Sequence, residues 1–66
     1  MREWLLDARK KRDITQAVVA DAVGIKREYY TMIENGVRTP SVENAMKIAG
    51  VLKVDWTMFF SSVLTK

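Results

Sequence analysis

Residues 15–34 read TQAVVADAVGIKREYYTMIE and contain two short helical patterns that meet at Gly24. The first pattern begins after Thr15, a residue type that caps helix N-termini. Gly24 then stands where a chain that leaves a helix needs a positive φ. The second pattern ends at the Asn-Gly pair 35–36, which is a strong stop signal. Two short helices joined by so tight a turn have the spacing of a helix-turn-helix, although paired helices with a glycine turn are common.

Helical patterns continue on both sides of this pair. Apolar residues recur on one face between residues 2 and 12, and Ser41 and Asp55 are N-caps for two further helices. Strand signals are poor, because no stretch of four residues alternates cleanly and ends in turn residues. The sequence therefore predicts an all-α fold, a compact bundle of five helices over about residues 2–12, 16–23, 26–34, 42–52 and 56–64. The expected core residues are Leu5, Ala8, Val19, Ala20, Val23, Ile25, Tyr30, Ile33, Ala45, Ile48, Ala49, Leu52, Trp56, Phe59 and Phe60.

The composition narrows the possible classes of function. The chain has 66 residues, so we expect one domain over residues 1–66, with marginal stability. It contains no cysteine and no histidine, which excludes a disulfide framework, a thiolate metal site and a histidine proton shuttle. No apolar run approaches the roughly 18 residues of a membrane helix, and the first residues show no signal-peptide pattern. These features favour a soluble, cytoplasmic domain without metal, cofactor, membrane partner or evident small-molecule ligand.

The charged residues favour binding over catalysis. The carboxylates are spread along caps and helix faces, without a cluster that could act as a general acid–base pair, so we expect no enzyme activity. The formal net charge of +3 is too small by itself to prove a polyanionic partner. The position of the charges along the chain is more informative than their sum. Seven of the eleven basic residues lie between Arg9 and Arg38, together with four acids.

Several different short motifs follow one another at specific spacings along most of the chain. The motifs are Ile14-Thr15-Gln16, Val19-Ala20, Val23-Gly24-Ile25, Ile33-Glu34-Asn35-Gly36, Pro40-Ser41 and Ile48-Ala49. Over residues 4–60 this pattern resembles the Xre family, the phage-repressor and Cro-type helix-turn-helix regulators of bacteria and their phages. The resemblance implies a lambda-repressor-like DNA-binding domain with its helix-turn-helix at about residues 16–34. It also implies a transcriptional regulator, most simply a repressor, that binds a pseudo-palindromic operator in double-stranded DNA as a homodimer.

The resemblance further implies that the second helix of the pair enters the major groove. On a helical wheel Tyr30 and Ile33 centre the buried side of this helix. The residues expected to contact base edges are therefore Lys26, Arg27, Glu28, Thr31 and Met32. Arginine and lysine suit guanine, glutamate can accept from cytosine, and methionine offers apolar contact. An ordinary solvated helix face is the alternative, and it explains Lys26 and Glu28 better than an exposed Met32.

Phosphate contacts are expected on both sides of that helix. Gln16 begins the first helix of the pair, where unpaired N–H groups and the helix dipole favour an anion. In the family this glutamine contacts phosphate and helps to hold the first base-reading side chain. The other phosphate contacts implied are Tyr29, Asn35, Arg38 and Thr39. Asn35 could instead serve as the helix stop alone, and Tyr29 could merely cover the turn.

Two structural expectations also come from the resemblance. The family pairs an arginine of the first helix with the glutamate before Asn-Gly, and Arg9 and Glu34 occupy these positions. We therefore expect a partly buried ion pair, in which Glu34 is structural and not a catalytic acid. The family often has glycine where Asp13 and Lys53 stand, so this chain departs from the pattern in two turns.

The C-terminal residues indicate a second copy of the chain as partner. Met58, Val63 and Leu64 are apolar, and little chain is left to cover them. We expect a two-fold homodimer formed by the helix at 56–64. An alternative is a protein-interaction module of the antitoxin or anti-repressor type, in which DNA binding is secondary.

Overall fold

The computed structural model describes residues 1–61, which form four α-helices and one 3₁₀-helix. Within these residues there is no strand, so the predicted all-α helix-turn-helix fold is confirmed. The elements in chain order are α1 (Glu3–Lys11), α2 (Gln16–Val23), α3 (Arg27–Glu34), α4 (Val42–Leu52) and the 3₁₀-helix η1 (Trp56–Phe60).

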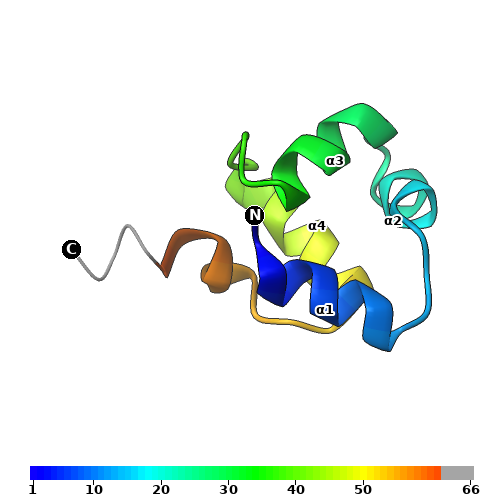
Figure 1. Ribbon diagram of the computed structural model, residues 1–66. Coiled ribbons are helices and arrows are strands. Elements are labelled where there is room, and N and C mark those ends of the chain that lie inside the picture. Colours follow the sequence, from blue (N-terminus) through cyan, green and yellow to red (C-terminus); the bar gives the residue numbers. More distant parts are fainter. Residues whose placement is uncertain (62–66) are drawn as a thin grey trace.

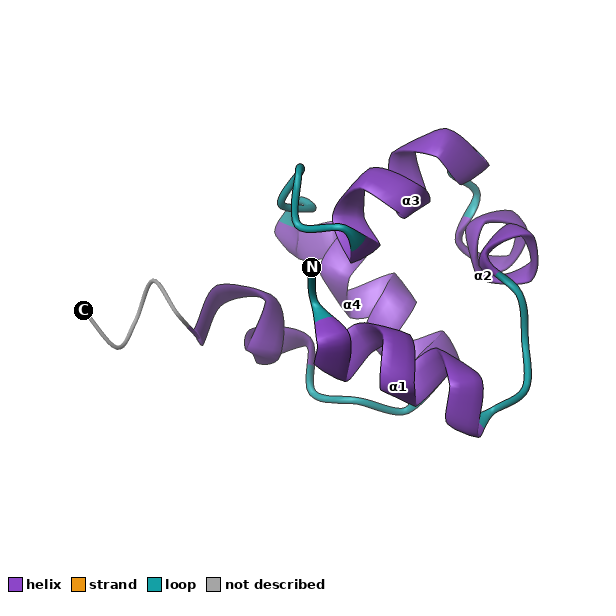
Figure 2. Cartoon of the chain, viewed as in Figure 1, coloured by secondary structure: helices purple, strands orange, loops and turns teal. Residues whose placement is uncertain are grey.

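The helices α2 and α3 pack against each other at one end of the molecule (Figures 1 and 2). α1 lies below them in this view and α4 lies behind, while η1 extends from the opposite end. The N-terminus lies beside the end of α3, because the backbone N–H of Arg2 donates to the carbonyl of Glu34 at 2.8 Å. Among the described residues, no other helix covers the outer side of α3.

The prediction of five α-helices is wrong in its last member. Residues 56–60 form the 3₁₀-helix η1, in which the N–H of Met58 donates to the carbonyl of Asp55 three residues earlier, at 3.1 Å. The Asp55 side chain accepts from both the N–H and the hydroxyl of Thr57, which favours this tight first turn. The predicted continuation to residue 64 includes Val63 and Leu64, which lie outside the described residues.

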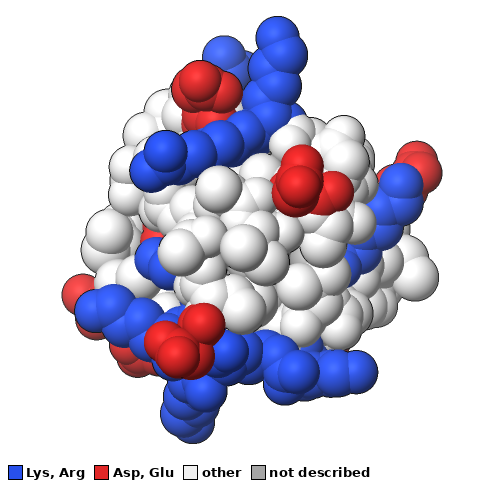
Figure 3. Space-filling model, turned by 90° about the vertical axis from the view of Figure 1, so that its right-hand side faces the viewer, with Lys and Arg blue, Asp and Glu red and all other residues white. Residues whose placement is uncertain are grey.

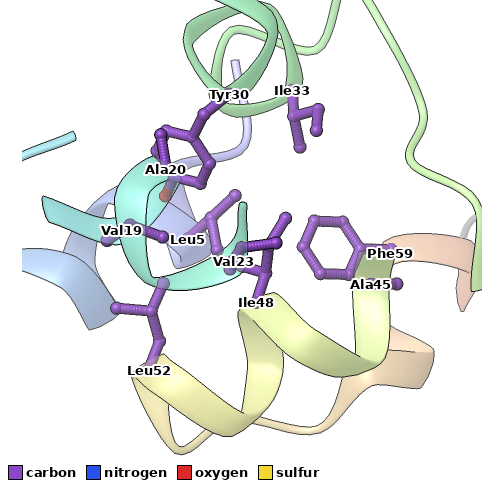
Figure 4. Packing of buried hydrophobic residues seen from close by; sticks show 10 residues of the cluster. All are labelled: Leu5, Val19, Ala20, Val23, Tyr30, Ile33, Ala45, Ile48, Leu52 and Phe59. Carbon is purple, nitrogen blue, oxygen red and sulfur yellow. The ribbon is translucent and has the colours of Figure 1, made fainter. Parts of the chain in front are cut away.

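The core lies where the four α-helices and η1 meet (Figure 4). Its buried hydrophobic residues are Leu5, Val19, Ala20, Val23, Tyr30, Ile33, Ala45, Ile48, Ala49, Leu52 and Phe59. All of these belong to the core that the sequence predicts. Trp4 adds an edge-to-face contact with Phe59, with ring centroids 4.9 Å apart, and so joins α1 to η1.

The local signals at helix ends behave as their residue types predict. The hydroxyl of Thr15 accepts from the N–H of Val18 at 3.2 Å, and Gly24 ends α2 with φ +85°. Asp13 and Lys53 adopt φ angles of 56° and 59°, the left-handed region that favours glycine. The two positions at which the chain departs from the family's usual glycine are therefore strained turns.

Replacing Lys53 with glycine is expected to stabilise the protein by about 1 kcal/mol, since the left-handed conformation costs a side-chain-bearing residue roughly that much. Lys53 is exposed, so little packing is lost. The midpoint of thermal unfolding should rise by about 4–8 °C. Asp13→Gly is the matched control and should gain less, because aspartate tolerates this conformation better than lysine does. An unchanged or lower midpoint for Lys53→Gly would contradict the argument.

Candidate nucleic-acid interface

The N-terminal end of α3 projects polar side chains away from the core. Lys26 is the N-cap of α3, and Arg27 and Glu28 are its first two residues. All three are exposed, whereas Thr31 and Met32, one turn further on, are half-buried. The five residues predicted to read bases thus come from one helix and its N-cap, and the three charged residues at its start are the most exposed of them.

A shallow hollow separates the start of α2 from the start of α3. Gln16, Arg27, Glu28 and Thr31 line it, and its volume is about 310 Å³. One predicted phosphate contact and three predicted base contacts therefore share a single depression. Lys26 lies outside its lining.

The carboxylate of Glu34 holds three helices together beneath this hollow. Its side chain is 1% exposed and is paired with Arg9 of α1, whose Nε and Nη2 donate to the two carboxylate oxygens at 2.9 and 3.0 Å. The hydroxyl of Tyr30 donates to Oε2 at 2.8 Å, and the side-chain amide of Gln16 donates to Oε1 at 2.9 Å. Arg9 also donates to the carbonyl of Ile14 through Nη1. These bonds fix the position of α3 relative to α1 and α2.

The protonation states of this network follow from its contacts. Burial by itself raises the pKa of Glu34, but the hydrogen bonds from Arg9, Gln16 and Tyr30 outweigh burial and leave that pKa below its ordinary value. The hydrogen bond with Glu34 raises the pKa of Arg9. Burial, followed by the hydrogen bond to Glu34, raises the pKa of Tyr30. At neutral pH the network therefore contains a carboxylate, a guanidinium and a neutral phenol, which is a structural arrangement.

The loop after α3 carries three of the predicted phosphate contacts. Asn35, Arg38 and Thr39 are exposed. Asn35 is the C-cap of α3 with a right-handed backbone, so the helix stop is completed by Gly36, whose φ is +82°. Tyr29, on α3 itself, is half-buried and packs against the core cluster.

Basic side chains lie around the edges of this end of the molecule. Figure 3 shows Lys and Arg at the upper, lower and right-hand edges of this side, with Asp and Glu side chains beside them and a mostly uncharged surface between. Lys26 is the N-cap of α3 and Arg27 is its first residue, whereas Lys10 and Lys11 lie in the last turn of α1. The basic surplus of residues 9–38 is therefore shared between different helices.

The sequence model of the helix-turn-helix family matches residues 5–59. The chain belongs to the Xre-type helix-turn-helix family. It is 52% identical over 63 residues to the uncharacterized HTH-type transcriptional regulator YqaF of Bacillus subtilis, a match that covers 96% of this chain and 83% of the relative.

Two further relatives carry more specific names. The cryptic phage CTXphi transcriptional repressor RstR of Vibrio cholerae is 39% identical over 54 residues, covering 82% of this chain and 48% of the repressor. The control protein C.MunI of a Mycoplasma species is 34% identical over 55 residues, covering 83% of this chain and 74% of the relative. No solved structure was found to match the chain.

Membership of the Xre family makes the chain a helix-turn-helix transcriptional regulator, in a family that binds double-stranded DNA and is not a class of enzymes. In the part of the chain that the structure describes, no helix is long and apolar enough to cross a membrane.

Arg2 is a positioning residue that the sequence patterns did not reveal. Its guanidinium donates to the carbonyls of Ile33 and Arg38 at 2.5 and 3.0 Å and to the hydroxyl of Thr39 at 3.3 Å. It also lies 5.5 Å from the ring centroid of Phe59, within reach of a cation–π interaction. Arg2 therefore ties the start of α1 to the loop after α3. A basic residue at the start of the chain has no motif that signals this role.

Proposed function

We propose that this Xre-family regulator binds a specific pseudo-palindromic operator in double-stranded DNA as a homodimer and acts as a repressor. The observation that carries the proposal is the exposed N-terminal end of α3, held at a fixed angle by the Glu34 network. A helix that is rigidly held and unobstructed can enter the major groove. The name of YqaF, a transcriptional regulator, supports a role in transcription, and the name of RstR, a transcriptional repressor, supports repression.

The roles of individual residues follow from this placement. Lys26, Arg27, Glu28, Thr31 and Met32 contact base edges in the proposal, and Gln16, Tyr29, Asn35, Arg38 and Thr39 contact phosphates. Arg27 is the first residue of α3 and is exposed, which suits a bidentate contact with guanine O6 and N7. Arg38 is exposed in the loop after α3, which suits a phosphate on the flank of the groove. The protein acts in this proposal within the cytoplasm of a bacterium or of a phage's host.

Arg27→Ala and Arg38→Ala are expected to weaken DNA binding in different ways. Loss of Arg27 should cost about 1–3 kcal/mol on the preferred site and relax preference at one base pair, because a base contact is lost. Loss of Arg38 should weaken binding to all duplexes alike, because phosphates carry no sequence information. Equilibrium titrations of each variant against the preferred site and single-base variants measure both effects.

Lys47→Ala is the matched control for these titrations. Lys47 lies on α4, is half-exposed and pairs with Glu43 one helical turn away at 3.3 Å. Its removal takes away the same charge as the other two variants but from a different helix. Binding of all three variants at the parent's affinity would contradict the docking, as would an equal loss for Lys47→Ala.

The homodimer in this proposal forms through η1 and the residues that follow it. Met58 supports the proposal because it is an apolar residue with 39% of its surface exposed, and Trp56 and Phe60 are half-buried in the same element. Sedimentation at micromolar concentration is expected to give a dimer, and Met58→Glu should shift the population towards monomer. Val18→Glu is the control, since Val18 is also apolar and exposed, with 49% of its surface accessible, but lies on α2 at the other end of the molecule. A strict monomer, with or without DNA, would contradict the dimer.

A further inference from the structure

The hydrogen bonds around Glu34 fix which way the amide of Gln16 points. An ionised carboxylate can accept hydrogen bonds but cannot donate them. The group of Gln16 that lies 2.9 Å from Glu34 Oε1 must therefore be its NH₂. The carbonyl oxygen of Gln16 is then turned towards α3, where the hydroxyl of Thr31 donates to it at 2.9 Å.

The same reasoning fixes the polarity of the Thr31 hydroxyl. A threonine hydroxyl has one proton to donate and two lone pairs that accept. Because the proton is directed to Gln16, Thr31 can offer only lone pairs to anything that enters the hollow between α2 and α3. The second proton of the Gln16 amide is not used by Glu34, so it can be donated to a phosphate oxygen.

We propose that the chain of hydrogen bonds Glu34–Gln16–Thr31 makes Thr31 an obligate acceptor that selects a base with an exocyclic amino group. In the major groove these groups are adenine N6 and cytosine N4, whereas guanine O6 and thymine O4 are acceptors. Thr31 therefore favours adenine or cytosine at one position of each half-site and disfavours guanine and thymine. The inference rests on the proposed entry of α3 into the major groove.

Three features of the site favour this reading over a bond that merely packs α2 against α3. Thr31 lines the hollow together with Arg27 and Glu28, the exposed residues at the start of α3. The hydrogen bond from Thr31 to Gln16 is partly buried, so the hydroxyl proton is not easily turned away from Gln16. The network begins at a carboxylate whose pairing with Arg9 keeps it ionised. The ionised Glu34 carboxylate thus determines the donor and the acceptor in each hydrogen bond, first at Gln16 and then at Thr31.

Thr31→Val, Thr31→Ser and Gln16→Met separate these readings, with binding measured to a preferred site and its three single-base variants at every position. Thr31→Val removes the hydroxyl at nearly constant shape and should lower the discrimination at one position about three- to tenfold. Thr31→Ser keeps the hydroxyl and should keep the preference. Gln16→Met lets the Thr31 hydroxyl rotate and donate, so the discrimination between bases should fall at the same position. It also removes the proposed phosphate contact, so the affinity should fall by the same factor for every DNA sequence.

The outcomes distinguish this inference from the proposed function. If the parent binds specific DNA and Thr31→Val keeps the parent's preference at every position, the inference is overturned and the function stands. A preference for guanine or thymine that depends on the Thr31 hydroxyl also overturns the inference. If the parent shows no sequence preference, both are overturned. Thermal unfolding of each variant checks that it is folded at the temperature of the titrations.

A measurement without DNA tests the network itself. The Gln16 side-chain proton that faces Glu34 is expected to exchange with solvent more slowly than those of the exposed Asn35 amide, which serves as reference in the same spectrum. Thr31→Val should change the chemical shifts of the Gln16 amide. Rapid exchange of both Gln16 protons in the parent would overturn the inference whatever the DNA titrations show.

Discussion

Replacing Arg9 with methionine is expected to destabilise the protein by about 3–5 kcal/mol, because it leaves the buried Glu34 carboxylate without its cationic partner. Both nitrogens that Arg9 directs at Glu34 lie within 3.0 Å of a carboxylate oxygen. A domain of this size has little stability in reserve, so a large part of the population should unfold at room temperature. Urea denaturation followed by circular dichroism measures the change.

The surface pair Lys47–Glu43 provides the control for this experiment. Lys47→Met makes the same kind of substitution in an exposed pair and should change the stability by about 0.5 kcal/mol or less. The double variant Arg9→Met/Glu34→Leu should be more stable than Arg9→Met alone, since it removes the stranded charge. A loss below about 1 kcal/mol for Arg9→Met would show that Glu34 finds other compensation and is not held by this pair.

The pH dependence of stability tests independently how much the ionised Glu34 contributes to the stability of the fold. The pKa of Glu34 lies below its ordinary value of 4.5, so the unfolded chain takes up this proton more readily than the folded protein. The stabilisation is therefore complete above that ordinary value and is lost as the pH falls through the lower pKa of the folded state. The double variant lacks this carboxylate and should lose less stability between neutral and acid pH than the parent does.

The affinity for the operator is expected to fall about a thousandfold between 50 and 200 mM salt. A dimer brings Lys26, Arg27 and Arg38 of both copies, six cationic side chains in all, against the duplex. The release of about one counterion for each of them gives a slope near −5 for log affinity against log salt, whether the side chain contacts a base edge or a phosphate. The release of condensed counterions drives this term, so it does not depend on the base sequence. Titrations at four or more salt concentrations yield the slope.

Variants test whether the slope comes from the proposed residues. Arg38→Ala removes two cationic contacts per dimer and should make the slope shallower by about 2 units. Lys47→Ala should leave the slope unchanged, because Lys47 lies on α4 and is outside the proposed interface. A slope near zero for the parent would mean that few phosphates are neutralised, which contradicts the docking of α3 and its following loop.

The ends of a helix were predictable where a single residue type determines the local backbone conformation. Thr15 and Gly24 mark the two ends of α2, and both act in the structure as their types indicate. The last helix was not predictable in type, since the two-bond cap of Asp55 on Thr57 favours a 3₁₀ turn that apolar spacing does not report. Lys53 was noticed only because the chain resembles a family that often has glycine at this position. The structure shows the reason, since the φ angle of Lys53 is 59°.

One ion pair of the candidate site was predictable, whereas the hydrogen bonds around it were not. The resemblance indicated Arg9 with Glu34, and the structure places them in contact. The engagement of Gln16 by both Glu34 and Thr31 depends on how closely α2 and α3 approach, which no spacing along the chain records. Arg2 gave no signal either, because its partners are backbone carbonyls 31 and 36 residues away, and any residue type can supply a carbonyl.

Selection of bound sites from random double-stranded DNA tests whether α3 reads a DNA sequence. We expect the enrichment of a pseudo-palindromic motif, with two half-sites about one helical turn apart. The same selection with Arg27→Ala should return a motif that is degenerate at one position of each half-site. Recovery of no motif from the folded parent at low salt, where electrostatic binding is strongest, would contradict the claim that α3 reads a DNA sequence.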